Sequence, residues 1–329
     1  MSGQYIIAID LGGQSAKIAI VDLDGQIRQK WSIHTNILDQ GEHIVPDIIA
    51  SIKDHLALYQ LEEKNLLGIG MGSPGSVNQQ AGTVHGAFNL NWEDQQDLTT
   101  AFHQAFDLPF YLENDANIAA LGEQRQGAGH NQAHVVLITL GTGIGGGIII
   151  DDQIYHGKQG SAGEVGHMIL NKDSHIQCTC GRYGCFEALA SATGLNNLAR
   201  DYSLRFSGPS AIKEAIDSGQ EVTAKEIIQA SQDNDLFAQK IFDEYTSYLG
   251  QGCANLIDIL TPACIILGGG ISKAGDYLLK AVQAKCEQYV FKALEGQTEI
   301  VLAELGNDAA LIGAAELVKT REGEGLTKA

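Results

Sequence analysis

One histidine and three cysteines between residues 167 and 185 form the most specific chemical pattern in the chain. His167 is followed by Cys178, Cys180 and Cys185, with glycines among the cysteines. Imidazole nitrogen and thiolate sulfur are ligands of tetrahedral Zn²⁺, and four protein ligands leave no open position for a substrate. The pattern therefore predicts a structural zinc site. A disulfide is the alternative interpretation, which a cytoplasmic location would disfavour.

Two glutamates, Glu164 and Glu187, stand close to these ligands in the sequence. A histidine that binds zinc through one ring nitrogen presents the other nitrogen to a hydrogen-bond partner. Here the partner could be a hydroxyl of a bound ligand, with the zinc loop acting as a frame that holds His167 and both carboxylates. Taken singly, each glutamate would be interpreted as a solvated surface carboxylate.

Asp10 ends the apolar segment 5–10 and is followed by Gly12 and Gly13. Glycines let backbone N–H groups approach phosphate oxygens, and a carboxylate at a strand end can hold Mg²⁺ directly or through water. Lys17 is a candidate phosphate contact. An ordinary hairpin with a solvated lysine gives the same pattern, so both interpretations stay open.

Five glycines occur within residues 141–147, between two apolar segments. No Gly-Lys-Ser/Thr follows, which excludes a Walker loop, and a strand is predicted next, which excludes a dinucleotide fingerprint. So many glycines would destabilise a plain hairpin. We therefore expect a ligand or another backbone close to Gly141 and Gly143, with Thr142 donating its hydroxyl.

Asp115 lies in the segment ENDAN (113–117), where a strand is predicted to end and a helix to begin. A carboxylate in that position can accept the proton of a hydroxyl that attacks phosphorus. Asn114 could hydrogen-bond a neighbouring hydroxyl. Asn and Asp are also preferred helix N-caps, so the pattern by itself does not decide between capping and catalysis.

Two further turns are candidates for ligand contact. Gly269 and Gly270 follow an apolar strand and would let an adenine and ribose lie against the backbone, although a helix start capped by Ser272 explains them equally well. Gly75 follows Ser73 and Pro74 at the end of another strand. It could belong to a sugar-binding turn or to a simple bend.

The hydrophobic pattern predicts the elements that position these residues. Apolar segments at 5–10 and 17–22, followed by residues 26–35, predict a β-meander. A helical stripe at 43–59 precedes strands at 66–72 and 109–115, and further strands are predicted at 134–140 and 264–268. The arrangement of strand, glycine turn and strand recurs about 130 residues after its first copy, which indicates a duplicated unit and two lobes with a cleft between them.

Composition limits the classes of function. The chain has 329 residues and a net charge of -19, which disfavours nucleic acid or an anionic membrane as a partner. No apolar run is long enough to span a bilayer, and the N-terminal segment lacks the features of a signal peptide. We therefore expect a cytoplasmic protein with small-molecule ligands. The remaining cysteines, Cys253, Cys264 and Cys286, are interpreted as core residues.

Taken together, the motifs resemble the ROK family of bacterial repressors and sugar kinases, and within it the glucokinases of Gram-positive bacteria. The resemblance covers nearly the whole chain, in family order, through Asp10-Leu-Gly-Gly, GMGSPGSV, GAFNLNW, ENDANIAALGE, LGTGIGGG, GEVGH, CTCGRYGCFEALAS and ILGGGIS. It implies an α/β fold of the actin-like, hexokinase-like (ribonuclease H-like) ATPase type, with a smaller lobe from 1–113 plus 308–329 and a larger lobe from 114–307.

The resemblance also implies roles for single residues. Asp115 would be the general base in phosphoryl transfer from Mg-ATP to a hexose. The residues that would hold sugar hydroxyls are Gly75, Asn114, Glu164, His167 and Glu187. His167 and the three cysteines of its motif would bind structural zinc, and the glycine turns at 10–13 and 141–147 would hold phosphates. A homodimer or homotetramer is also implied.

One position departs from the family. Gln14 stands where the family usually has threonine after the Asp-x-Gly-Gly motif, so a hydroxyl for a metal-bound water is missing and the phosphoryl donor, ATP or polyphosphate, is less certain. The alternatives are a kinase for another hexose (N-acetylmannosamine, N-acetylglucosamine, fructose or a β-glucoside) and a sugar-responsive regulator. The regulator is disfavoured because only four residues precede the first strand.

Overall fold

The computed structural model describes residues 4–327 and divides into two compact units. Unit 1 consists of residues 1–131, 147–162 and 305–329, and unit 2 of residues 132–146 and 163–304. These units differ from the expected lobes in three segments, residues 114–131, 147–162 and 305–307. The helix at 115–126 and residues 147–162 belong with the N-terminal segment, because the C-terminal helix packs closely against the helix at 115–126.

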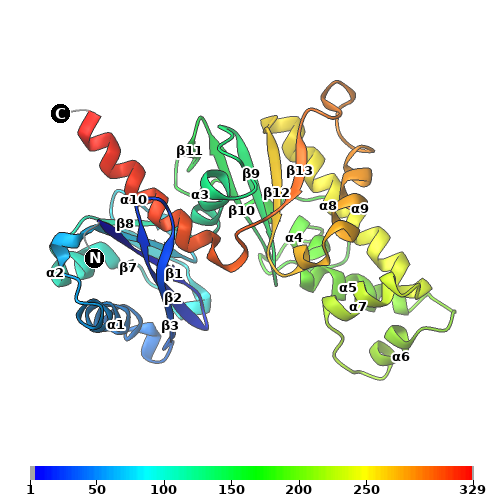
Figure 1. The fold of residues 1–329 in the computed structure, drawn as a ribbon. Coiled ribbons are helices and arrows are strands. Elements are labelled where there is room, and N and C mark those ends of the chain that lie inside the picture. Colours follow the sequence, from blue (N-terminus) through cyan, green and yellow to red (C-terminus); the bar gives the residue numbers. More distant parts are fainter. Residues whose placement is uncertain (1–3, 328–329) are drawn as a thin grey trace. The chain divides into compact units, whose positions relative to one another are not determined.

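Unit 1 is built on a five-stranded sheet in the order β3-β2-β1-β4-β8 (Figure 1). The strands are β1 (Tyr5–Leu11), β2 (Ser15–Asp22), β3 (Ile27–His34), β4 (Leu66–Ser73) and β8 (Phe110–Asn114). The first three form the predicted antiparallel meander, and β4 and β8 continue the sheet in parallel with β1. A small second sheet contains β5 (Ser76–Asn78), β6 (Thr83–His85) and β7 (Gln96–Asp97).

The helices of unit 1 bury apolar faces. They are α1 (Ile44–Leu58), α2 (Leu98–Ala105), α3 (Asp115–Gln126) and α10 (Ala309–Thr327). The predicted stripe of α1 is confirmed, since Ile44, Ile48, Ile52 and Leu56 are all buried in one core with the strands of the meander. Burial of such a stripe, at about 1.5–3 kcal/mol per large aliphatic side chain, is what makes this helix stable.

Unit 2 contains most of a second five-stranded sheet, in the order β11-β10-β9-β12-β13. Its strands are β9 (Val135–Leu140), β10 (Ile144–Ile150), β11 (Gln153–Ile154), β12 (Cys264–Gly268) and β13 (Glu299–Leu302). In both sheets the third strand of a meander lies at one edge and two parallel strands follow the first. The shared strand order confirms the duplication that the sequence indicated.

Six α-helices accompany the second sheet: α4 (Phe186–Ala190), α5 (Ala192–Ser203), α6 (Ala211–Asp217), α7 (Ala224–Gln232), α8 (Leu236–Leu260) and α9 (Asp276–Cys286). The 3₁₀ turns of the chain are Asp39–Gly41, Glu63–Asn65, Phe88–Leu90, Val165–His167, Ile271–Ala274, Lys292–Leu294 and Gly306–Asp308. Among residues 4–327, no helix has both the length and the apolar composition needed to cross a bilayer.

The isolated cysteines are core residues, as predicted. Cys253, Cys264 and Cys286 are buried in α8, β12 and α9, and all three are free thiols. Burial raises the pKa of Cys264 to about 11 and that of Cys286 to about 11, so these groups are protonated and unreactive at neutral pH.

Candidate active site

The carboxyl ends of β1, β4 and β8 bring the first group of predicted residues to one edge of the sheet in unit 1. Asp10 pairs in register with Gly72, Gly72 pairs with Glu113, and Ser73 pairs with Asn114. In open α/β sheets, ligands bind outside the carboxyl ends of the strands. Asp10 and the start of α3 therefore meet at the edge where chemistry is expected.

Asp10 is neutralised by the residue opposite it on β2. The Lys17 ammonium donates to Asp10 Oδ2 at 2.7 Å, and the two side chains are 36% and 16% exposed. Lys17 is thus an ion-pair partner of the predicted magnesium-binding carboxylate. A Mg²⁺ ion that binds Asp10 would share the carboxylate with Lys17. A phosphate would instead compete with Asp10 for the Lys17 ammonium.

Some backbone groups of the β1–β2 turn already form hydrogen bonds within the protein. The Gly12 N–H donates to the Ser15 carbonyl at 3.1 Å, and the Thr35 hydroxyl donates to the Gly12 carbonyl at 2.7 Å. A Cβ on Gly13 would lie 2.9 Å from the Asn89 carbonyl, so this glycine is required by backbone packing. Gln14 is exposed and accepts from the Thr35 N–H through its carbonyl.

The start of α3 combines capping with the predicted site. Asn114 Oδ1 accepts from the N–H groups of Ala116 and Asn117, so Asn114 is the N-cap, and Asp115 is the first helical residue. Asn114 Nδ2 donates to the Gly75 carbonyl at 3.3 Å. Gly75 has φ of +91°, and a Cβ there would lie 2.9 Å from the His85 carbonyl. The structure therefore brings Gly75, Asn114 and Asp115 together within unit 1.

The glycine turn of unit 2 is pressed against Glu187. A Cβ on Gly143 would lie 2.3 Å from Glu187 Oε2, and the same oxygen accepts from the Ile144 N–H at 3.1 Å. The Thr193 hydroxyl donates to the Thr142 carbonyl at 2.8 Å, while Thr142 itself is exposed. Close approach explains Gly143, as the sequence predicted, but the approaching group is a carboxylate of the protein.

A cavity of about 740 Å³ lies beside this turn, within unit 2. Its lining includes Gly141, Thr142 and Gly270, together with the N-terminal end of α7 and the 3₁₀ turn at 271–274. Gly269 has φ of +85° and packs on the backbone of Leu140, which joins the two glycine turns. Ser272 does not cap a helix, because its hydroxyl donates to the Gly269 carbonyl and α9 begins only at Asp276.

Two lysines in this cavity were not found from the sequence. Lys225 and Lys273 line it, and neither has an ion-pair partner among the described residues. The cavity is within the range of about 300–1,000 Å³ that is common for small-molecule sites. Isolated lysines carry no motif, so only the fold could associate them with the glycine turns.

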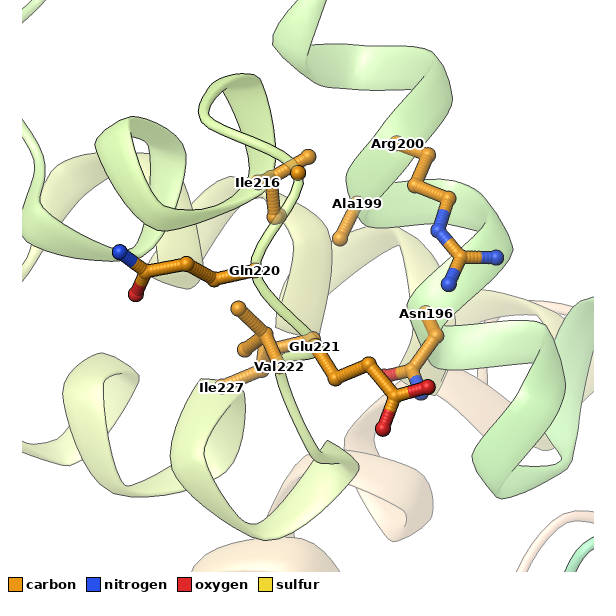
Figure 2. A pocket seen from close by; sticks show the side chains of 9 residues that line it. Asn196, Ala199, Arg200, Ile216, Gln220, Glu221, Val222 and Ile227 are labelled. Atoms are coloured by element: carbon orange, nitrogen blue, oxygen red, sulfur yellow. The ribbon is translucent and has the colours of Figure 1, made fainter.

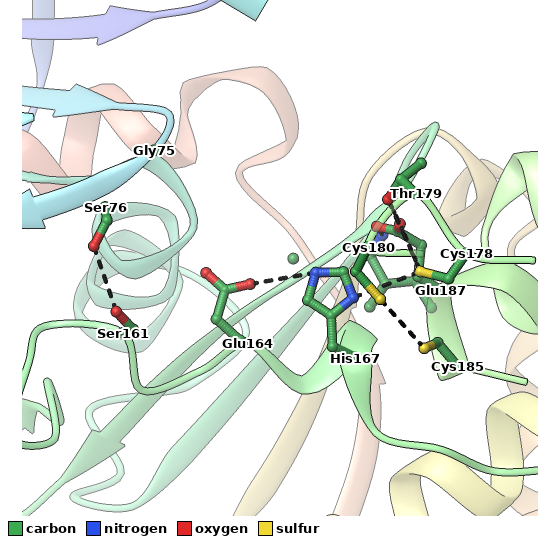
Figure 3. A network of polar contacts seen from close by, with 12 residues as sticks. Gly75, Ser76, Ser161, Glu164, His167, Cys178, Thr179, Cys180, Cys185 and Glu187 are labelled. Carbon is green, nitrogen blue, oxygen red and sulfur yellow. Dashed lines mark hydrogen bonds and ion pairs between the residues drawn. The ribbon is translucent and has the colours of Figure 1, made fainter. Parts of the chain in front are cut away.

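The zinc motif forms one cluster in unit 2 (Figure 3). One ligand atom of each of the four predicted residues lies within 4.8 Å of all the others. Cys178 Sγ is 3.6 Å from His167 Nδ1, and Cys180 Sγ is 3.7 Å from Cys185 Sγ. Tetrahedral Zn²⁺ with its usual bond lengths separates its ligands by about 3.5–3.8 Å. The cluster fits zinc, and its sulfur atoms are too far apart for a disulfide.

The surroundings of the cluster shift its thiols in opposite directions, because burial raises the pKa of Cys178 and raises that of Cys185 to about 12. Arg182 donates to Cys180 Sγ at 3.5 Å, and this hydrogen bond lowers the pKa of Cys180 to about 6. A thiolate is the form of cysteine that binds zinc. The arginine thus favours the ligand state of Cys180 before any ion is present.

The His167 ring separates the cysteines from Glu164 (Figure 3). His167 Nδ1 faces Cys178, whereas Nε2 faces Glu164 Oε2 at 4.0 Å. If Nδ1 binds zinc, Nε2 is the nitrogen left for another partner. Glu187 differs, because Oε1 accepts from the Thr179 hydroxyl and Oε2 from the Ile144 N–H, so it connects the zinc loop to the glycine turn.

A second cavity of unit 2, of about 160 Å³, contains none of the predicted site residues (Figure 2). Asn196 and Arg200 of α5 line it together with Glu221 and Val222, which precede α7. It is too small for a nucleotide, and Gly219 is the single glycine among the residues that line it.

Comparisons with known proteins agree with this architecture. Residues 6–321 match the family model described as the ROK family. The glucokinase of Halalkalibacterium halodurans is 38% identical over 327 residues, which is 98% of this chain and 97% of that protein. The xylose repressor of Caldicellulosiruptor bescii is 30% identical over 95% of this chain and 77% of its own length.

A solved structure extends the comparison to three dimensions. The ROK family glucokinase of Streptomyces griseus in complex with glucose and AMPPNP has a TM-score of 0.76 and 30% identity, over 96% of this chain and 99% of that one. The family model and the full-length relatives indicate the same family, and they confirm the resemblance noted in the motifs. The chain belongs to the ROK family.

Proposed function

We propose that the protein is a glucokinase, which transfers the γ-phosphoryl group of ATP to the 6-hydroxyl of D-glucose. The proposal is supported by a full-length relative named as a glucokinase and by a related structure that holds glucose and an ATP analogue. The observation on which it depends most is the start of α3, where the hydrogen-bonded Asn114 fixes Asp115 at a strand end next to Gly75.

In this proposal Asp115 accepts the proton of the attacking hydroxyl. As the first residue of α3 it lies at the positive end of the helix dipole, which favours the ionised carboxylate that can act as a base. Glucose hydroxyls would be bound by Gly75, Asn114, Glu164, His167 and Glu187. Because Glu187 already accepts hydrogen bonds from the Ile144 N–H, the Thr179 hydroxyl and the Cys178 thiol, we propose that it contributes less to sugar binding than His167 Nε2 and Glu164 do.

ATP would occupy the cavity of unit 2, with adenosine against Gly269, Gly270 and the N-terminal end of α7. Lys225 and Lys273 supply positive charge there in a chain whose net charge is -19. The phosphates would contact the turns that contain Gly12, Gly13, Gly141, Thr142 and Gly143, with Gln14 and Lys17 near the β1–β2 turn. Mg²⁺ would neutralise the β- and γ-phosphates, and Asp10 would hold it through water.

Zinc would be structural in this enzyme. His167, Cys178, Cys180 and Cys185 would complete its coordination, and the ion would fix the imidazole and the loop that carries Glu187. We also propose a cytoplasmic homodimer or homotetramer, which light scattering of the purified protein would test. None of these assignments requires a nucleic acid or a membrane as partner.

A coupled assay tests the proposed function. Purified protein is supplied with glucose, N-acetylmannosamine, N-acetylglucosamine or fructose, and with ATP or polyphosphate in parallel. We expect glucose and ATP to give the highest kcat/KM. A higher value with another hexose would replace glucose as the substrate, and no phosphorylation of any sugar would reject the kinase assignment.

Substitution of the base provides the first prediction. Asp115→Asn keeps the shape of the side chain but cannot accept the proton, so kcat should fall about 10²- to 10⁴-fold. Glucose affinity, measured by calorimetry, should change less than about fivefold. Wild-type turnover in this variant would exclude Asp115 as the base.

A further inference from the structure

Glu113, the residue before the proposed sugar-binding pair, is a buried carboxylate whose two oxygens are both occupied. It is 1% exposed at the end of β8. Oε1 accepts from the Asn114 N–H at 2.8 Å and from Asn117 Nδ2 at 2.9 Å. Oε2 accepts from His156 Nε2 at 2.6 Å and from Gln79 Nε2.

A buried carboxylate is costly unless donors surround it, and an apolar residue would fill the same space more cheaply. The four donors come from three separate segments of unit 1: the loop after β5, the start of α3, and the stretch after β11. Glu113 therefore connects segments that are far apart in the sequence. Stability alone gives no reason for choosing a carboxylate at this position.

Both donors to Glu113 Oε1 belong to the turn that contains the proposed base, Asp115. Asn117 donates to Glu113 through its side chain, while its backbone N–H donates to Asn114 Oδ1. Asn114 in turn donates to Glu113 through its N–H and to Gly75 through its side chain. Asn114 and Asn117, which lie before and after Asp115 in this turn, are thus both hydrogen-bonded to the Glu113 carboxylate.

The hydrogen bonds of Oε2 hold that carboxylate from the other side. An ionised Glu113 only accepts, so in the tautomer that bonds to it His156 Nε2 is the donor, and Gln79 Nε2, at 2.5 Å from that ring nitrogen, is then not hydrogen-bonded to it. His156 is 26% exposed, and together with Gln79 it lines a cavity of about 320 Å³. Gly160, four residues later, packs against the Val77 carbonyl, where a Cβ would lie at 2.6 Å, so the segment is anchored to β5 as well.

We propose that Glu113 and His156 are positioning residues for phosphoryl transfer, which act by holding the first turn of α3 so that Asp115 lies in line with the attacking hydroxyl. The inference rests on the proposed function. Glu113 itself has no exposed oxygen with which to touch a substrate. The pair acts through Asn114 and Asn117, and a displacement of about 1 Å at a reacting group can reduce the rate about 10²-fold.

The test compares Glu113→Gln and His156→Ala with the wild type. We expect kcat to fall about 10- to 100-fold in each variant, while KM for glucose and for ATP changes less than about threefold. His156→Gln, which restores an N–H donor, should recover at least about a third of the wild-type kcat. The double variant should lose little more than the worse single variant, because the two residues act as a unit. His103→Asn, at an exposed position of α2, is the matched control and should leave kcat unchanged.

Hydrogen exchange gives a readout that does not depend on activity. In Glu113→Gln, the amides of Ala116 and Asn117 should exchange about tenfold faster, while those of the remaining strands of unit 1 stay protected. His156→Ala, which changes a partly exposed side chain, keeps the test usable if Glu113→Gln does not fold.

Each outcome decides a separate question. Wild-type kcat in folded variants, additive losses in the double variant, or exchange that accelerates throughout unit 1 would overturn the positioning role. If the wild type phosphorylates no hexose, the proposed function fails, and exchange at the start of α3 still decides whether Glu113 and His156 hold that turn.

Discussion

At the scale of single residues, one side chain can serve both the local fold and the candidate site. Asn114 was equally well explained as a helix cap or as a ligand-binding residue, and the structure shows that it caps α3 with Oδ1 while Nδ2 reaches Gly75. The two interpretations are compatible because the two ends of one amide point to different partners. A sequence cannot reveal this division, since it depends on the turn at Gly75 being folded back beside β8.

The four residues of the proposed zinc site were predicted from their spacing, and the structure places them in one cluster. Their effect on Glu187 was not predictable. Its carboxylate lies between the Thr179 hydroxyl of the zinc loop and the Ile144 N–H of the glycine turn, and only the fold brings those two segments together. Glu187 therefore links the proposed zinc site to the glycine turn through a single side chain.

The six cysteines give a prediction at this scale. In the zinc-bound protein all six thiols should react slowly with an aromatic disulfide reagent. Removal of the metal by a strong chelator should release one zinc ion and make Cys178, Cys180 and Cys185 reactive within minutes. Cys253, Cys264 and Cys286 should stay unreactive until the protein unfolds, since burial raises their pKa.

Zinc release can be followed with a metallochromic dye, and labelled cysteines can be assigned by mass spectrometry. Cys180→Ser serves as the comparison, because it should weaken zinc binding without exposing the three core thiols. One rapidly reacting thiol and no zinc would indicate a disulfide in place of the metal site.

At the scale of elements, the sequence predicted which segments form helices and strands but not which helices touch. The pairing of α3 with α10 is the clearest example. A Cβ on Gly313 would lie 1.7 Å from the Ile118 carbonyl, and a Cβ on Gly122 would lie 2.1 Å from the Ala309 carbonyl. The two helices cross at glycines, so their backbones approach more closely than side chains would allow. Isolated glycines in a helical pattern gave no hint of a partner.

Gly313→Ala should therefore destabilise the protein, by about 2 kcal/mol or more, because the new methyl group displaces one backbone from the other. The melting temperature measured by calorimetry should fall by several degrees. Gly323→Ala is the control on the same helix, where a Cβ meets no atom within 4 Å. It should be neutral or stabilise the protein by up to about 1 kcal/mol, since alanine has the higher helix propensity. Equal effects of the two substitutions would contradict the close crossing.

At the scale of the whole molecule, the duplication is the feature that the sequence revealed best. A glycine turn between two apolar strands occurs twice, and each copy starts a five-stranded sheet with the same strand order. The division into units was harder to predict. The chain passes between them at four places, and one of these lies inside a strand, at Gly146 and Gly147 of β10, where no loop marks the boundary. Composition marks flexible linkers but not a strand that is shared.

The two glycine turns belong to different units, and this gives a prediction about ligands. We expect adenosine to occupy the cavity beside Gly270 and therefore to slow hydrogen exchange at residues 141–143, 223–226 and 270–274 of unit 2. It lacks phosphates, so the amides of residues 12–15 in unit 1 should exchange at the rate of the free protein. A non-hydrolysable ATP analogue with Mg²⁺ should slow exchange in both regions.

The comparison needs ligand concentrations well above the dissociation constants, because protection follows the bound fraction. ADP with Mg²⁺ is the intermediate case and should protect unit 2 fully and residues 12–15 only in part. The physical reason is that the base and ribose need a cavity, which unit 2 provides, whereas the proposed function assigns phosphate contacts to each of the glycine turns. Protection of residues 12–15 by adenosine alone would show that the nucleoside binds elsewhere than in the cavity of unit 2.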